Sequence, residues 1–109
     1  AWHRGCRLAD NGYGIPEPVE GPLQVPMSMD WVLMPLVAYD SSGRRLGMGG
    51  GFYDRSFAFK IDRSEIAPRL IGVAYACQAM AAAATARLPA ESWDVGMNGL
   101  LNEHGLIKF

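Results

Sequence analysis

Two long apolar runs stand out in the pattern of hydrophobic and polar positions along the chain. One covers residues 31–39 and the other residues 69–77, and neither alternates regularly with polar residues. Such runs predict strands that are buried on both faces, as in a parallel or mixed sheet. Proline cannot donate a hydrogen bond to a strand ladder, so Pro35 predicts a bulge or a break inside the first run.

The segment between these runs predicts a turn, a glycine-rich loop and a helix. Residues 40–43 favour a turn in which Gly43 has positive φ. Residues 52–60 carry a modest amphipathic pattern typical of a helix, and the polar residues 61–68 predict a loop. Two buried strands separated by a helical crossover indicate an α/β fold, and we expect residues 1–109 to form a single α/β domain.

The segments outside the two runs give weaker signals. Residues 1–11 suit a short helix or a strand equally well, and residues 12–22 contain three prolines and three glycines. That second composition predicts a stiff extended loop, either a linker or a rigid loop presenting Tyr13, Ile15 and Glu17 to a pocket.

After the second run, the sequence predicts three further elements. Six alanines favour a helix over residues 78–88, ended by Pro89. Residues 88–98 predict an exposed loop, and the apolar residues of 99–109 predict one short final strand.

Charge and composition narrow the possible partners. The formal net charge is −1, which gives no general electrostatic reason to bind nucleic acid or an anionic membrane. No apolar run approaches the roughly 18 residues of a membrane span, and the first residues lack a signal-peptide pattern, so we expect a cytoplasmic protein. We expect Cys6 and Cys77 to be reduced structural thiols, with a single disulfide as the alternative.

Residues 43–55 concentrate the chemistry of the chain. Four glycines at positions 47–51 follow Arg44 and Arg45, and such a loop leaves several N–H groups free to surround a phosphate, to which arginine adds forked donors. The loop lacks the Gly-Lys-Ser/Thr of a Walker motif, and Phe52 occupies the third glycine position of the dinucleotide fingerprint. The alternative is a flexible surface turn between a strand and a helix.

Two carboxylates, Asp54 and Asp94, are candidate Mg²⁺ ligands. Mg²⁺ commonly takes one or two protein carboxylates together with substrate phosphate oxygens. Because ligands of α/β sheets lie at the carboxyl ends of strands, we expect both loops along one edge of the sheet. The structural alternatives are charge complementarity at a helix N-terminus for Asp54 and turn formation for Asp94. No Ser/His/Asp or Cys/His nucleophile pattern is present.

Several blocks together resemble the 5-formyltetrahydrofolate cyclo-ligase family, also called methenyltetrahydrofolate synthetases. They are Gly14-Ile-Pro-Glu-Pro, residues 32–40, the Arg-Leu-Gly-Met-Gly-Gly-Gly-Phe-Tyr-Asp signature of residues 45–54, Ile71-Gly-Val-Ala-Tyr-Ala-Cys-Gln and Leu88-Pro-Ala-Glu-Ser-Trp-Asp-Val. The resemblance implies a three-layer, Rossmann-like mixed or parallel sheet flanked by helices, without the family's N-terminal part. It also implies Mg²⁺- and ATP-dependent conversion of 5-formyltetrahydrofolate to 5,10-methenyltetrahydrofolate, with release of ADP and phosphate.

The resemblance also implies roles for individual residues. Arg45 would be catalytic, steadying the transferring phosphoryl group, and Asp54 and Asp94 would hold Mg²⁺. The ATP-binding residues would be Arg45, Leu46, Gly47, Met48, Gly49, Gly50, Gly51, Phe52 and Tyr53. The folate substrate would contact Met48, Gly49, Gly50, Gly51 and Phe52.

The chain departs from the family pattern in its length and near its end. Family members are nearly twice as long, and neither their basic helix nor their folate-contacting glutamate is identifiable in residues 1–11. Asn98 stands where the family commonly has a second aspartate. We therefore expect self-association or a missing N-terminal half as a partner, and keep a non-catalytic nucleotide- or folate-binding relative, or an incomplete fragment of the enzyme, as the alternative function.

Overall fold

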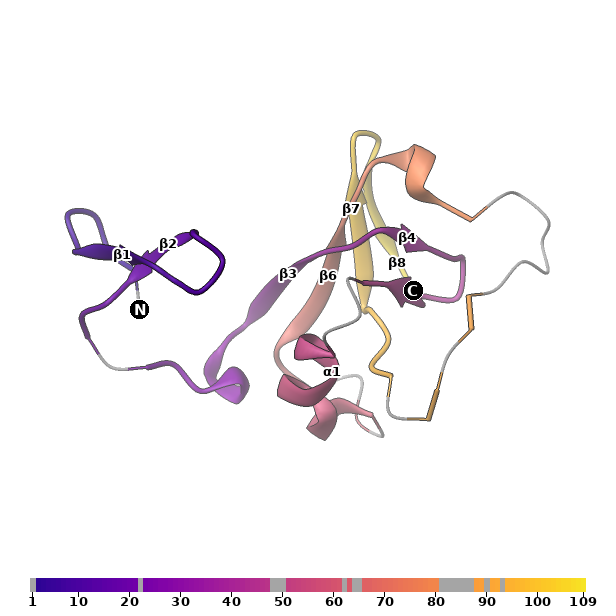
Figure 1. Ribbon diagram of the computed structural model, residues 1–109. Coiled ribbons are helices and arrows are strands. Elements are labelled where there is room, and N and C mark those ends of the chain that lie inside the picture. The colour runs from indigo at the N-terminus through magenta and orange to yellow at the C-terminus, as the bar shows by residue number, and fades with distance from the viewer. Residues whose placement is uncertain are drawn as a thin grey trace.

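A computed structural model of the chain describes residues 2–21, 23–47, 51–61, 63, 66–80, 88–89, 91–92 and 94–109. Its centre is a four-stranded sheet in the order β3 (Trp31–Pro35), β6 (Arg69–Val73), β7 (Gly99–Asn102) and β8 (Gly105–Lys108). The first three strands run parallel and β8 is antiparallel to β7, so the predicted mixed α/β sheet is confirmed (Figure 1). The final apolar residues form a hairpin of two strands rather than the single predicted strand.

The first apolar run is interrupted where proline predicted it. Strand β3 ends at Pro35, and the chain resumes as β4 (Ala38–Tyr39), which pairs antiparallel with β5 (Arg45–Leu46). The connection is the predicted turn, with Gly43 at φ 86°. The expectation that this run is buried on both faces was wrong, because Trp31 and Leu33 are 57% and 58% exposed.

The short helix α1 (Phe52–Ser56) covers one face of the sheet together with the 3₁₀ turn η2 (Ala58–Lys60). The core between them contains Met34, Tyr39, Phe57, Leu70, Val95, Met97 and Leu100, with Tyr53 and Phe59 packed against it. Among the described residues no helix covers the opposite face. The three-layer arrangement is thus represented by two of its layers.

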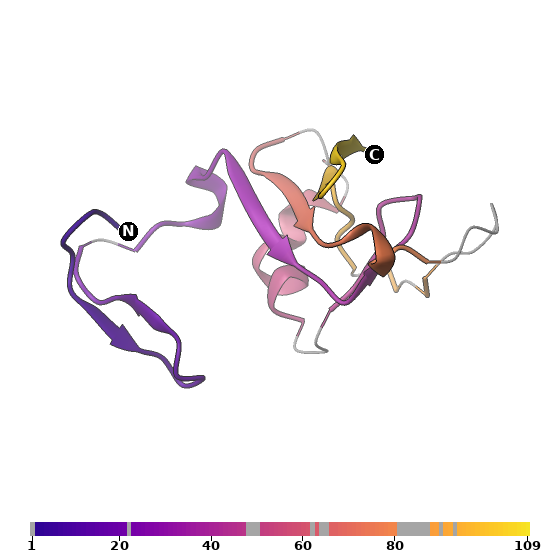
Figure 2. The same ribbon diagram turned by 90° about the horizontal axis from the view of Figure 1, so that it is seen from above.

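The N-terminal segment forms an arm that projects from the sheet (Figures 1 and 2). Strands β1 (Leu8–Asp10) and β2 (Pro16–Pro18) pair antiparallel in this arm. The predicted extended loop over residues 12–22 was therefore wrong at its centre, because the φ imposed by proline is compatible with an isolated edge strand. Most of the predicted helix over residues 78–88 lies outside the described residues; at its start, Gln78 ends the 3₁₀ turn η3 (Ala76–Gln78).

Asp40 is the anchor of the β4–β5 turn. It is 2% exposed; its Oδ1 accepts hydrogen bonds from the Ser42 hydroxyl and the backbone N–H groups of Ser42 and Arg44, and its Oδ2 accepts one from Leu88 N–H. Burial opposes ionisation, but these hydrogen bonds outweigh it and hold the pKa of Asp40 below its ordinary value of 3.8.

This pKa shift predicts acid sensitivity. A carboxyl whose folded pKa is depressed contributes stability above its unfolded pKa, and this contribution is lost as pH falls through the folded value. Asp40→Asn turns a donor toward Leu88 N–H, so we expect it to destabilise the fold by about 1–3 kcal/mol at pH 7. We also expect it to flatten the fall in stability below about pH 4. Urea titrations between pH 2 and 7 check this; the exposed Asp10→Asn is the control, and an unchanged acid slope in Asp40→Asn contradicts it.

Candidate functional site

The candidate site forms where the β4–β5 hairpin meets α1. Between them, residues 48–50 lie outside the described residues, so the predicted roles of Met48, Gly49 and Gly50 are without structural description. Gly51 precedes the helix as its N-cap residue at φ 64°, in the left-handed region that favours glycine. A side chain at this position is also crowded, because an added Cβ lies 3.0 Å from Nη1 of Arg55.

Arg45 turns toward α1 and is nearly enclosed. Its side chain is 10% exposed, and Nη2 donates to Oδ1 of Asp54 at 2.9 Å. The guanidinium carbon lies 5.4 Å from the centre of the Tyr53 ring, within the range of a cation–π contact. The Nε atom is buried without a hydrogen-bond partner in the described structure. Because buried polar groups are normally paired, this leaves a cation with unused donor capacity.

Asp54 joins two segments that are distant in sequence. Its Oδ1 also accepts the backbone N–H of Val95 at 3.0 Å, so the segment that leads into β7 is tied to α1. The side chain is 19% exposed. The sequence pattern identified Asp54 but missed the Val95 amide, since a backbone donor leaves no residue-type signal.

Asp94 lies beside this contact through its neighbour Val95, but its own carboxylate serves a local turn. Oδ2 accepts the N–H of Glu91 at 2.9 Å, and Asp94 N–H donates to the Glu91 carbonyl at 3.1 Å. The residue is exposed. Within the described part of the chain, no group of three or more His, Cys, Asp or Glu residues is placed to hold a metal ion.

The site does not lie at the carboxyl ends of the strands as expected. The loop with Asp94 follows β6 in sequence, but the connection returns to the amino end of β7, where Asn98 exchanges hydrogen bonds with the amino end of β6 at Leu70. The two loops do meet, through Asp54 and Val95, on the amino-terminal approach to β7. Arg44 is turned away from the site, because its Nη1 donates to the Leu88 carbonyl.

An aromatic group borders the site on the α1 side. Phe52 is 64% exposed and meets Tyr53 edge to face at 5.2 Å, and Tyr53 stacks on the buried Phe57 at 6.4 Å. Tyr53 thereby connects the Arg45 guanidinium to the core, while Phe52 presents a free ring to solvent. Leu46 and Gly47 complete the described part of the loop, with an added Cβ of Gly47 lying 3.5 Å from Nη1 of Arg45.

Comparison with known proteins identifies the family of the chain. The model of the 5-formyltetrahydrofolate cyclo-ligase family matches residues 3–103. The chain belongs to this family. It is 41% identical over 96 residues to the 5-formyltetrahydrofolate cyclo-ligase of Haemophilus influenzae and 38% identical to that of Escherichia coli K12, covering 86% of this chain in both cases.

The solved structures agree with this family assignment. The NMR structure of Aquifex aeolicus 5,10-methenyltetrahydrofolate synthetase matches with a TM-score of 0.73 at 35% identity, over 97% of this chain and 48% of that one. The chain spans about half the length of the cyclo-ligases it matches. Among the described residues no helix is long and apolar enough to cross a membrane, and Cys6 and Cys77 are both free thiols.

Proposed function

We propose that this chain supplies the nucleotide- and folate-binding part of an ATP- and Mg²⁺-dependent 5-formyltetrahydrofolate cyclo-ligase. In this reaction the γ-phosphoryl group of ATP passes to the formyl oxygen of 5-formyltetrahydrofolate, with release of ADP. N10 of the folate then attacks the formyl carbon and phosphate leaves, which closes the ring of 5,10-methenyltetrahydrofolate.

The observation that carries the proposal is the enclosed Arg45 guanidinium, whose Nε has no hydrogen-bond partner among the described residues. Phosphoryl transfer asks a protein mainly for positioning and for stabilisation of charge on the transferring group. A cation in a site shielded from water does this more strongly than one in solvent. Tyr53 holds the guanidinium in place from one side, so Arg45 is oriented before a nucleotide arrives.

The loop between Leu46 and Tyr53 provides the remaining contacts of this proposal. The backbone N–H groups around Gly47 and Gly51, together with those of residues 48–50, would surround the phosphates of ATP. Phe52 offers its exposed ring to the flat heterocycle of the folate, with Met48 and the neighbouring glycines completing that contact.

The residues fit a magnesium ion with one primary ligand. Both hydrogen bonds to the Asp54 carboxylate end on Oδ1, and no described residue donates to its Oδ2. Asp94 lies one residue from the Val95 contact, and its carboxylate would join once released from the Glu91 amide. When bound, Mg²⁺ supplies positive charge that neutralises the phosphate oxygens of ATP.

Two assays test the proposed function and its alternative. Incubation with 5-formyltetrahydrofolate, ATP and Mg²⁺ should produce methenyltetrahydrofolate absorbance that depends on ATP. A non-catalytic relative, suggested by the half-length match, should instead gain thermal stability from ATP and Mg²⁺ without any product. If neither product nor a shift in Tm appears, both readings are wrong.

Asp54→Asn should weaken the magnesium response. Asparagine keeps an oxygen that can accept the Val95 N–H, so the fold should persist, but the negative charge at the proposed ligand is lost. Mutation of a residue that only hydrogen-bonds a metal ligand already lowers metal affinity by about 10–100-fold. We therefore expect the half-saturating Mg²⁺ concentration to rise at least about tenfold when the proposed ligand itself is changed. Mg²⁺ titration of the ATP-dependent shift in Tm measures this, with Asp10→Asn as the control; an unchanged response removes Asp54 from the site.

A further inference from the structure

Residues 88–97, which we call the returning loop, begin and end on the β4–β5 turn. At the start of the loop, both backbone groups of Leu88 are held by side chains of that turn. The Leu88 N–H donates to Oδ2 of Asp40 at 2.8 Å, and the Leu88 carbonyl accepts a hydrogen bond from Nη1 of Arg44 at 3.1 Å. We call Asp40 and Arg44 the Leu88 clamp, because they bind the same residue through both of its backbone groups.

The end of the returning loop lies against the same turn. Met97 N–H donates to the Gly43 carbonyl at 2.9 Å. A Cβ added to Gly43 would lie 3.1 Å from the Met97 carbonyl oxygen, so glycine is favoured here by this close approach as well as by its φ of 86°. Compact loops with neighbouring ends are Ω-loops, which are frequently functional.

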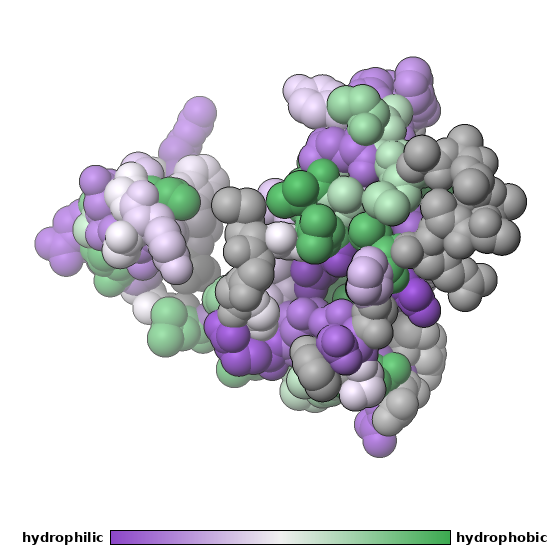
Figure 3. Space-filling view, turned by 45° about the vertical axis from the view of Figure 1, so that its right-hand side comes forward, coloured by the Kyte–Doolittle hydropathy of each residue, from purple (hydrophilic) through white to green (hydrophobic). Residues whose placement is uncertain are grey.

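Between its two ends the returning loop turns apolar side chains inward and polar ones outward. Leu88, Val95 and Met97 are 6%, 5% and 5% exposed, whereas Glu91 and Asp94 are exposed to solvent. The connection that contains the loop lies on the right of Figure 1 and comes forward in Figure 3, where hydrophilic residues lie beside hydrophobic ones at the surface. The buried residues hold the loop against the molecule and leave Asp94 accessible.

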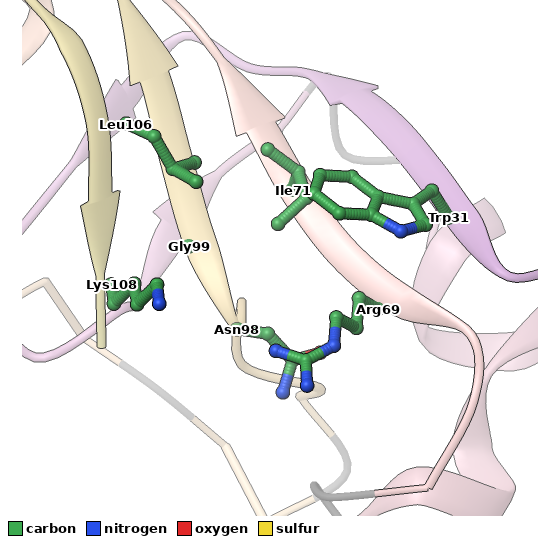
Figure 4. Close-up of a pocket in the computed structure, with 7 residues that line it drawn as sticks. All are labelled: Trp31, Arg69, Ile71, Asn98, Gly99, Leu106 and Lys108. Carbon is green, nitrogen blue, oxygen red and sulfur yellow. The ribbon is translucent and has the colours of Figure 1, made fainter.

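The amino end of β7 gives the returning loop a fixed exit. Oδ1 of Asn98 accepts the Leu70 N–H at 2.9 Å, and Asn98 N–H donates to the Leu70 carbonyl at 2.8 Å. Figure 4 shows Asn98 beside Arg69 among the side chains that line a hollow of about 430 Å³. Because this exit is tied to the central strands, the remaining freedom of Asp94 depends on the attachment at Leu88.

One contact connects the returning loop to the candidate site. Val95 N–H donates to Oδ1 of Asp54, the same oxygen that accepts Nη2 of Arg45. The loop is therefore attached to the turn at its entry and to the Asp54 carboxylate near its exit, and Asp94 lies between these attachments.

The contacts of Arg44 differ from those of its neighbour. Adjacent residues of an extended strand point to opposite sides, and Arg44 directly precedes β5. Its guanidinium binds Leu88, whereas that of Arg45 binds Asp54. Residue type alone favours phosphate binding by both arginines, but the contacts favour it only for Arg45.

We propose that the two residues of the Leu88 clamp are positioning residues for the candidate site. They hold the entry of the returning loop so that the Val95 amide and the Asp94 carboxylate lie at Asp54, and Arg44 does not contact the nucleotide. The consequence for magnesium rests on the proposed function, whereas the contact of Val95 with Asp54 is formed without any ligand.

The first measurement uses the unliganded chain. A hydrogen-bonded amide proton resonates downfield in NMR spectra, so the Val95 amide reports its bond to Asp54. Arg44→Met removes the donor but keeps an apolar stem, and it should move the Val95 amide upfield while the Ile71 amide of β6 keeps its position. Arg44→Lys keeps a charged donor and should restore much of the shift. Arg7→Met, in the exposed N-terminal arm, is the matched control and should move neither signal.

The other half of the clamp should act through the same residue. Asp40→Asn turns a donor toward Leu88 N–H and should also move the Val95 amide upfield. Because both substitutions act on Leu88, the double variant should move it by less than the sum of the two. Circular dichroism shows whether each variant keeps the fold, and Arg44→Met carries the test if Asp40→Asn does not fold.

The second measurement tests the consequence for magnesium. Residues that only orient a metal ligand typically change metal affinity by about 10–100-fold. We therefore expect Arg44→Met to raise the half-saturating Mg²⁺ concentration of the ATP-dependent shift in Tm at least about tenfold. The affinity for ATP without Mg²⁺ should stay that of the unsubstituted chain, and Arg7→Met should change neither value.

An unmoved Val95 amide in Arg44→Met overturns the proposal, as does equal movement of the Val95 and Ile71 amides. A moved Val95 amide with an unchanged Mg²⁺ response also overturns it. Weaker binding of ATP without Mg²⁺ in Arg44→Met assigns Arg44 to the phosphates instead. If ATP and Mg²⁺ leave the Tm of the unsubstituted chain unchanged, the proposed function is wrong, and the amide measurement alone decides the role of the clamp.

Discussion

Replacing Arg45 with alanine is expected to lower the turnover of the cyclo-ligase reaction by about 100- to 1,000-fold. That is the range seen when one preorganised donor to a transition-state charge is removed. The substitution deletes the enclosed guanidinium with its spare Nε, while the binding contributed by the glycine loop remains. We therefore expect kcat to fall far more than KM rises. Steady-state kinetics on the active species, whether this chain alone or its complex, measure both.

Two variants separate charge from geometry in this prediction. Arg45→Lys keeps the positive charge but loses the forked donors, so it should recover only part of the lost turnover. Arg7→Ala, in the exposed Arg7–Glu20 pair of the N-terminal arm, should leave kcat unchanged. Equal losses in Arg45→Ala and Arg7→Ala, or full activity in Arg45→Ala, contradict the proposed role.

Replacing Leu100 with alanine is expected to destabilise the fold by about 2–5 kcal/mol. Leu100 is fully buried at the centre of the core, and truncation there removes apolar contacts and leaves a cavity. For a domain of this size, Tm should fall by about 10 °C or more. Thermal and urea unfolding followed by circular dichroism measure the change.

The next residue provides the control. Leu101 lies on the sheet face opposite α1 and is 41% exposed, so Leu101→Ala should change the stability of the isolated chain by only about 0.5 kcal/mol. Similar losses in the two variants would show that both faces of β7 are packed in solution, contrary to the described structure.

The sequence predicted the main strands because their signals were local. The break at Pro35 and the turn at Gly43 follow directly from the conformational limits of those residues. Full burial of residues 31–39 was wrong, because an apolar run indicates that both faces suit a buried environment but not whether both are covered. Trp31 and Leu33 are more than half exposed, because no described residue covers their side of β3.

The sequence singled out the residues of the candidate site but placed them at the wrong end of the strands. Arg45 and Asp54 are nine positions apart in a recognisable motif, and the structure pairs them. The prediction that the site lies at the carboxyl ends of the strands was wrong. The sequence does not reveal that the connection after β6 returns to the amino end of β7 before Asp94 is reached. Hydrogen bonds that depend on backbone amides, such as those of Val95 to Asp54 and Leu88 to Asp40, leave no pattern in residue types.

The bond from Val95 to Asp54 has a mechanical consequence. It links the first turn of α1 to the start of a central strand, since Val95 leads within four residues into β7. A ligand that binds the Asp54 carboxylate therefore changes the strength of the hydrogen bond from the Val95 amide, forty-one positions away in sequence. The rate at which the Val95 amide proton exchanges with deuterium should therefore change when a ligand occupies the glycine loop.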